Sequence, residues 1–191
     1  MTNTVTQVRE LLTQVPVPPG YRLPPGATDA ELAAFRAVSG LEIPNELEEW
    51  LRISNGPLVG AGGLYGVGEQ GESRASTIAE ILNLHPGWKD LGWIPVGGDG
   101  CGDYYVLSTK NPTTNRNAVL FIDCHEDELK PAYAVASNLW RFLRFHLRSE
   151  LGHRYWPFDK VRVLEEDPEL ELVRGSYCLG KPEPPQARSG L

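Results

Sequence analysis

Three strand-like runs follow one another in the second half of the chain, at residues 93–96, 103–107 and 118–122. Each run is rich in aromatic and branched aliphatic residues, which favour strands, whereas the stretches between them, GGDGCG and KNPTTNRN, favour turns. Connections this short join antiparallel neighbours, because parallel strands need a crossover of about a dozen residues or more. The pattern therefore predicts an antiparallel meander, and residues 133–135 are a candidate fourth strand.

Helical patterns lie on both sides of this meander. Thr28 with Glu31 and Thr77 with Glu80 form capping boxes, which mark the first turn of a helix. Ser137 is a candidate N-cap for a later helix with a wide apolar face. Apolar residues at helical spacing predict helices over residues 5–15, 29–39, 44–54, 78–82 and 138–147. A block of strands flanked by helices indicates the α+β class.

The length of 191 residues suits one domain with a substantial core, and 41% hydrophobic with 23% charged residues is typical of a globular protein. We therefore expect a single α+β domain over residues 28–150, preceded at 1–27 by an N-terminal helix and a proline-rich linker. Residues 151–180 form an extension, in which apolar residues suggest short strands at Val161, Val163, Leu170 and Leu172. Three prolines and few apolar residues predict a disordered tail at 181–191.

The formal net charge is −7, from 25 acidic and 18 basic residues. This balance argues against direct binding of nucleic acid or an anionic membrane and favours a basic protein partner, although the same acidity also keeps a protein soluble without any partner. No apolar run approaches the length of about 20 residues that a membrane span needs. Three widely spaced cysteines suit reduced thiols, so we expect a cytoplasmic protein.

A specific motif occupies the first strand of the meander and the turn after it. Trp93-Ile94-Pro95 is followed by the segment Gly98-Asp99-Gly100-Cys101-Gly102-Asp103-Tyr104. Alternating glycines permit positive φ, and aspartates can bond local amides. One interpretation is a tight turn that acts through the fold, and the other is a surface for a ligand or partner. The residues concerned are Trp93, Pro95, Gly98, Asp99, Gly100, Gly102 and Asp103.

Together with IPNELEEWLRISNG at 43–56, GLYGV at 63–67 and AVLFID at 118–123, this motif resembles the SUKH superfamily over about residues 29–147. A departure is Pro57, where the family commonly has another glycine. The resemblance implies an α+β domain that binds proteins and has no common catalytic site. SUKH proteins include bacterial immunity proteins, which neutralise toxins, and fungal regulators of cell-wall synthesis. Our first hypothesis is therefore an immunity protein, and our second is a regulatory scaffold that docks a housekeeping protein.

Cys101 is the candidate for nucleophilic chemistry, as a thiol hydrolase. The fold would have to bring a base beside its thiol, from His85, His125, His146 or His153. Asp99 and Asp103 would oppose formation of the thiolate, because reactive cysteines lie in electropositive surroundings. Calcium is also disfavoured, since the glycine-rich turn lacks the regular oxygen ligands of an EF-hand loop. We therefore rank the thiol hydrolase third and expect no catalytic residue, metal or cofactor.

Acidic residues in exposed loops are the candidate partner-binding groups. Asp99, Asp103, Glu126, Asp127 and Glu128 join or follow meander strands, where loops are accessible. A negative patch would speed encounter with a basic toxin domain such as a nuclease. In the alternative interpretation, Asp99 and Asp103 only brace the turn, and the other three are solvated loop charges.

The last predicted helix has an apolar face and an opposite basic stripe. His146 lies on the apolar face, so we interpret it as a core residue with a satisfied hydrogen bond. Arg141, Arg144 and Arg148 form the opposite stripe, which we expect to be a solvated face that also complements the helix C-terminus.

Overall fold

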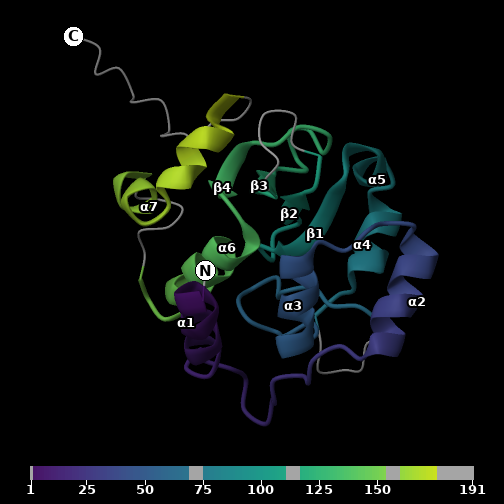
Figure 1. The fold of residues 1–191 in the computed structure, drawn as a ribbon, viewed down its shortest axis with the longest axis horizontal. Helices are drawn as coiled ribbons and strands as arrows, with labels where there is room; N and C mark the ends of the chain where they lie inside the picture. Colours follow the sequence, from purple (N-terminus) through teal and green to yellow (C-terminus); the bar gives the residue numbers. More distant parts are fainter. Residues whose placement is uncertain (1, 69–74, 111–116, 154–159, 176–191) are drawn as a thin grey trace.

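A four-stranded antiparallel sheet forms the core of the protein, with its strands side by side in chain order (Figure 1). The computed structural model describes residues 2–68, 75–110, 117–153 and 160–175. The strands are β1 (Trp93–Gly98), β2 (Tyr104–Ser108), β3 (Val119–Ile122) and β4 (Tyr133–Ala136). The sheet confirms the predicted meander, its fourth strand and the α+β class.

Helices surround this sheet (Figure 1). In the described residues they are α1 (Thr2–Leu12), α2 (Asp29–Ser39), α3 (Asn45–Ile53), α4 (Ile78–Leu84), α5 (Gly87–Leu91), α6 (Leu139–Glu150), α7 (Lys160–Glu166) and the 3-10 helix η1 (Pro168–Gly175). Helix α6 contacts α1, α3 and β4, whereas α4 and α5 contact β1. The short helix α5 was not predicted, because Pro86 and Gly87 indicate the end of a helix in isolation.

Neighbouring tyrosines of β2 show that helices cover both faces of the sheet. The ring of Tyr105 lies 5.0 Å from that of Phe142 on α6, measured between centroids, and the ring of Tyr104 lies 5.4 Å from that of Trp88 on α5. Successive residues of a strand point to opposite faces, so α6 and α5 pack on different sides. Strand β1 lies at an edge of the sheet, where Pro95 is tolerated because fewer amides must donate.

Local sequence signals determine where two helices in the first half of the chain begin. Both predicted capping boxes are present, with Thr28 and Glu31 at the start of α2 and Thr77 and Glu80 at the start of α4. In each box the threonine hydroxyl accepts a hydrogen bond from the backbone N–H of the third helical residue. The glutamate carboxylate in turn accepts a hydrogen bond from the backbone N–H of the threonine. These reciprocal bonds satisfy amides that would otherwise lack a partner.

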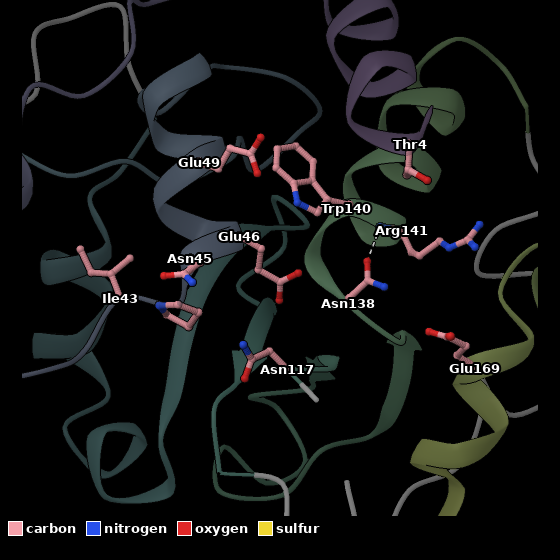
Figure 2. A pocket seen from close by; sticks show the side chains of 11 residues that line it. Thr4, Ile43, Asn45, Glu46, Glu49, Asn117, Asn138, Trp140, Arg141 and Glu169 are labelled. Atoms are coloured by element: carbon pink, nitrogen blue, oxygen red, sulfur yellow. Dashed lines mark hydrogen bonds between the residues drawn. The ribbon is translucent and has the colours of Figure 1, made fainter. Parts of the chain in front are cut away.

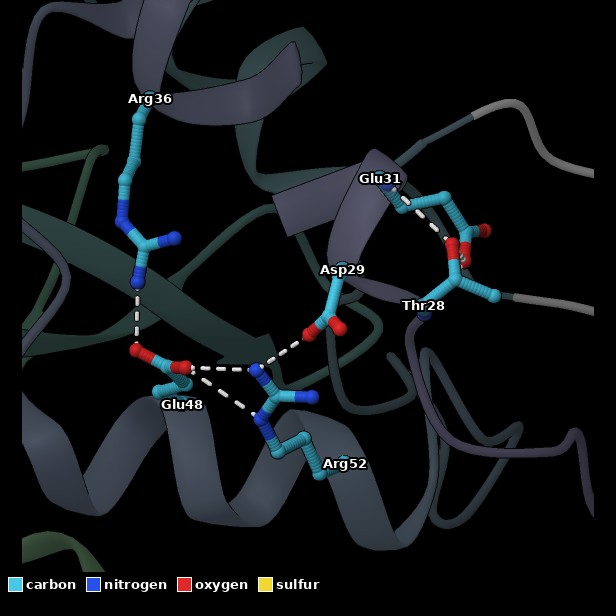
Figure 3. Close-up of polar contacts among 6 residues, drawn as sticks. All are labelled: Thr28, Asp29, Glu31, Arg36, Glu48 and Arg52. Atoms are coloured by element: carbon cyan, nitrogen blue, oxygen red, sulfur yellow. Dashed lines mark hydrogen bonds and ion pairs between the residues drawn. The ribbon is translucent and has the colours of Figure 1, made fainter. Parts of the chain in front are cut away.

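Ion pairs join α2 to α3 (Figure 3). Arg36 of α2 pairs with Glu48 of α3, and Arg52 of α3 binds Asp29 at 2.7 Å and Glu48 at 2.9 Å. The hydrogen bond from Arg52 is the main cause of a lowered pKa of Glu48. Because these side chains are largely exposed, the network orients the two helices but contributes little to stability.

The cap of α6 differs from the prediction by one residue. Asn138, not Ser137, is the N-cap, and its side chain accepts a hydrogen bond from the Arg141 amide at 2.9 Å. Ser137 instead donates its hydroxyl and its amide to the buried carboxylate of Asp167, at 2.6 and 2.8 Å. The Ser137 hydroxyl, which the local pattern assigned to capping, thus binds a residue 30 positions away in the sequence.

The described part of the C-terminal extension is helical, so the predicted strands at Val161, Val163, Leu170 and Leu172 are wrong. Val163, Leu170 and Val173 are 5%, 1% and 1% exposed. These buried residues are seven and three positions apart, a spacing typical of helices. In a strand, Val161 and Val163 would instead point to the same face. Val161 and Leu172 are exposed.

The basic stripe of α6 is not a solvated face, so that prediction is also wrong. Glu166 of α7 pairs with Arg144 at 2.8 Å and with Arg148 at 2.7 Å. Its backbone carbonyl accepts a hydrogen bond from Arg141 at 2.6 Å. The extension is therefore held on α6 by charge-assisted bonds. His146, on the other side of α6, is buried as predicted, and burial lowers its pKa.

No helix in the described part of the chain is both long and apolar enough to cross a membrane. The tail predicted at 181–191 lies outside the described residues, and the domain boundaries remain predictions.

Candidate protein-binding surface

A tight turn joins β1 to β2 between Asp99 and Asp103. The Oδ1 atom of Asp99 accepts hydrogen bonds from the backbone N–H of Cys101 at 2.7 Å and of Asp103 at 3.1 Å. Gly100 and Gly102 have φ angles of 83° and 102°, which residues with a Cβ atom rarely adopt. The turn is thus braced by its own carboxylate and by two glycines.

The remaining residues of the motif lie in the core. Trp93 is 4% exposed, and its ring centroid lies 6.3 Å from that of Trp88. Pro95 is buried in β1. Gly98 lies so close to the hydroxyl of Tyr65 that an added Cβ atom would collide with it. These positions support the interpretation that Trp93, Pro95 and Gly98 act through the fold.

The turn meets the loop that follows β3, although the two are about twenty residues apart in sequence. A carboxylate oxygen of Asp103 accepts a hydrogen bond from the amide of Cys124 at 2.9 Å. The Nε2 atom of His125 lies 3.4 Å from the carbonyl oxygen of Cys101. The structure therefore brings together the two stretches in which the sequence places candidate partner-binding residues.

Two aspartates order the loop between β3 and β4. The Oδ1 atom of Asp123 accepts from the amides of His125 at 3.0 Å and Glu126 at 3.2 Å, and the Oδ1 atom of Asp127 accepts from the amide of Leu129 at 3.0 Å. Sequence reasoning missed Asp123. An aspartate directly after a strand is a signal for such a turn, because its carboxylate reaches the amide two residues further on.

Glu128 differs from its neighbours because its side chain is already engaged. Its carboxylate lies 2.7 Å from Nδ1 of His85, and its carbonyl oxygen accepts a hydrogen bond from Nε1 of Trp88 at 2.7 Å. Glu126 and Asp127 are exposed, whereas Asp99 and Asp103 are half-buried. Glu128 is exposed as well, but of these three only Glu126 and Asp127 make no ion pair with a described residue.

The five predicted acidic residues and Asp123 form what we call the acidic surface. Its negative charge adds to the effect of burial on the pKa of nearby groups. Burial raises the pKa of the Cys124 thiol to about 11, and the carboxylates of Asp103, Glu128, Asp123 and Asp99 add to the effect. Burial also raises the pKa of Asp103, with Asp123 and Asp99 contributing. The acidic surface is defined by Asp99, Asp103, Asp123, Glu126, Asp127 and Glu128.

Exposed leucines lie beside the acidic surface. Leu129 is 53% exposed and its Cδ2 atom lies next to Gly87 at the start of α5. Leu84, 67% exposed, directly precedes His85, which binds Glu128. The sequence did not indicate these leucines as surface residues, since burial depends on packing. Apolar side chains beside charges suit a protein partner.

The surroundings of Cys101 do not favour a nucleophile. The side chain is exposed, its turn carries Asp99 and Asp103, and His125 faces its backbone carbonyl. Reactive cysteines need positive neighbours that stabilise the thiolate. Among the described residues, no group of three or more histidines, cysteines, aspartates or glutamates is arranged to hold a metal ion.

Comparison with protein families gives a match over residues 26–144 to the SMI1/KNR4 family (SUKH-1). This chain belongs to the SUKH-1 family. The resemblance that the sequence motifs indicated is thereby confirmed. No curated protein matches the chain.

The SUKH-1 match contains the whole acidic surface and the sheet that supports it. Helices α1, α7 and η1 lie outside the matched residues, and the match ends within α6. Glu166 and Asp167, which bind α6 and Ser137, therefore lie outside the matched residues.

Proposed function

We propose that this SUKH-1 protein is a non-enzymatic immunity protein, which binds a basic toxin domain in the cytoplasm and blocks it by covering its surface. The acidic surface carries the proposal, because Glu126 and Asp127 are exposed beside a turn that hydrogen bonds hold in place. Membership of the SUKH-1 family fits a protein-binding role of this kind. A nuclease domain is a suitable partner, since its nucleic-acid site presents the positive charge that the acidic surface complements.

The second candidate is a regulatory scaffold that docks a housekeeping protein. Family membership supports this role as well, and the acidic surface would serve either partner. The two candidates differ in the protein that is bound and in the consequence of binding. An immunity protein abolishes the activity of a toxin, whereas a scaffold leaves its partner active.

Charge reversal tests the role of the loop. We expect the variant Glu126→Lys to associate several-fold more slowly with a basic partner, because an attractive charge becomes repulsive. Asp127 and Glu128 stay unchanged, since replacing them would also remove the bond to the Leu129 amide and the contact with His85. The matched control is Glu165→Lys, which changes the net charge equally at an exposed site on α7.

The partner is first captured on the immobilised full chain from the cells that produce it and identified by mass spectrometry. Association rates are then measured with the purified partner at low and high salt, and inhibition of the partner is assayed. The proposal requires slower association and a weaker salt dependence for the loop variant alone. Equal rates for the wild type and the folded loop variant would exclude the acidic surface, and a captured partner that stays active when bound would favour the scaffold.

A further inference from the structure

A cavity of about 710 Å³ opens between α1, α3, α6 and η1, next to the start of β3 (Figure 2). This volume lies in the usual range for small-ligand pockets, which is about 300 to 1,000 Å³. Asn117, on its wall, precedes β3, whereas Asp123 of the acidic surface follows β3. The cavity is therefore at the opposite end of this strand from the acidic surface and constitutes a separate site.

Glu46 is the central group of the cavity. Its side chain points into the space between Asn117 and Asn138 (Figure 2). The Leu139 amide, at the start of α6, and the side chain of Asn117 act on the carboxylate as donors that lower its pKa, but by less than burial raises it. A carboxylate has about four acceptor positions, so these two donors leave part of its capacity unused.

Among the described residues of the cavity wall, no cation faces Glu46. The other charged residues on the wall are Glu49 of α3, Arg141 of α6 and Glu169 of η1. Figure 2 shows the guanidinium of Arg141 directed away from Glu46, and it donates to the carbonyl oxygen of Glu166 at 2.6 Å. Among the described residues, no ion pair reaches Glu46. The described wall thus presents the carboxylates of Glu46 and Glu49 without a facing cation, whereas Glu169 already has an interaction within the protein.

Trp140 adds an aromatic wall. Its indole lies beside Glu49 (Figure 2), but the residue is only 6% exposed, so it shapes the wall and offers no open face for stacking. A guanidinium group is planar, is weakly hydrated and binds carboxylates through two parallel hydrogen bonds. An ammonium group lacks the planar fork, and a bare metal ion would not fill a space of this size. The lining therefore matches a guanidinium better than either.

We propose that this cavity binds a guanidinium group, with Glu46 as the bidentate partner and Glu49 as a further attracting charge. The group belongs either to a small organic cation or to an arginine side chain of another protein. The site is independent of the proposed function, because no residue of the acidic surface lines the cavity.

Protons and ligand compete for Glu46. Burial raises the pKa of this carboxyl group to about 7, so it is partly protonated at neutral pH and an ionised form is needed for binding. A guanidinium stays charged throughout this range. Protonation lowers the ionised fraction about tenfold from pH 8 to pH 6, and affinity should fall by the same factor.

Calorimetry on the full chain provides the test, with propylguanidinium as the small cation, propylurea as its neutral analogue and a capped Gly-Arg-Gly peptide as the protein-like source. We expect saturable binding of a guanidinium probe, no binding of propylurea, and affinity about tenfold higher at pH 8 than at pH 6. Binding of the peptide alone would assign the arginine of a partner protein. Binding of propylguanidinium would assign a small cation.

Variants separate recognition from folding. Glu46→Gln should abolish the pH dependence and weaken binding at pH 8 by at least about tenfold, as the ionised partner is lost. Glu49→Lys, at an exposed site on α3, should weaken guanidinium binding several-fold, whereas Glu126→Gln on the acidic surface should leave it unchanged. The proposal is overturned if neither guanidinium probe binds, if propylurea binds equally well, or if both cavity variants keep the wild-type affinity.

Discussion

Glu46 shows how a single residue sets a pH dependence of stability. Its pKa is raised by burial to about 7 in the folded state, from an ordinary value of 4.5. A raised carboxyl pKa favours the folded state when the group is protonated, so its contribution is fully present below about pH 4.5 and is lost as pH rises through about 7. We predict that Glu46→Gln, compared with wild type, gains about 2 to 3 kcal/mol in free energy of unfolding between pH 5 and pH 8. Urea unfolding at both pH values measures this gain, with Glu49→Gln on the same helix as the control for a lost charge. A gain equal in both variants would contradict the assignment.

The C-terminal extension illustrates how one element is held on the domain. Asp167, fully buried between α7 and η1, accepts the amide and the hydroxyl of Ser137. We predict that Asp167→Ala lowers the free energy of unfolding by about 2 to 3 kcal/mol, because two buried donors lose a charged acceptor. The exposed Glu165→Ala on α7 should change it by less than about 0.5 kcal/mol. Chemical unfolding gives both values, and hydrogen exchange over residues 160–175 locates the effect. An Asp167 variant as stable as the Glu165 control would show that packing of Val163, Leu170 and Val173 alone holds the extension.

At the scale of the whole molecule, two parts of the C-terminal region should differ in their importance for stability. We predict that deleting residues 181–191 leaves the melting temperature unchanged, since three prolines and few apolar side chains provide no burial to offset chain ordering. Deleting residues 160–191 should lower it clearly, because α7 and η1 bury Val163, Leu170 and Val173 and bind α6. Calorimetric melting of the full chain and both truncated forms compares the three. A clear drop for the shorter deletion would mean that the tail packs on the protein.

Local interactions account for what the sequence predicted well. Each capping box depends on two residues three positions apart, so Thr28 with Glu31 and Thr77 with Glu80 determine where α2 and α4 begin. The strands are similarly determined by short runs of strand-forming residues between turn residues, and the motif from Trp93 to Tyr104 sufficed to indicate the family. The five acidic candidates were chosen because loops that follow strands are accessible, and their role in binding stays a prediction.

Contacts between distant residues account for what the sequence could not reveal. The local sequence predicts that the Ser137 hydroxyl caps α6, but in the fold this hydroxyl donates a hydrogen bond to the Asp167 carboxylate instead. In the sequence the arginines of α6 follow the pattern of a solvated face, but in the fold Glu166 pairs with them. Glu128 likewise resembles its acidic neighbours in sequence, but in the fold its carboxylate contacts His85. The cavity around Glu46 combines residues of four elements and of the segment before β3. The sequence by itself thus determined the family, the four strands and the starts of α2 and α4, because those signals act over a few residues. Only the tertiary structure decided which charges are paired, buried or exposed, because that depends on residues brought together from distant parts of the chain.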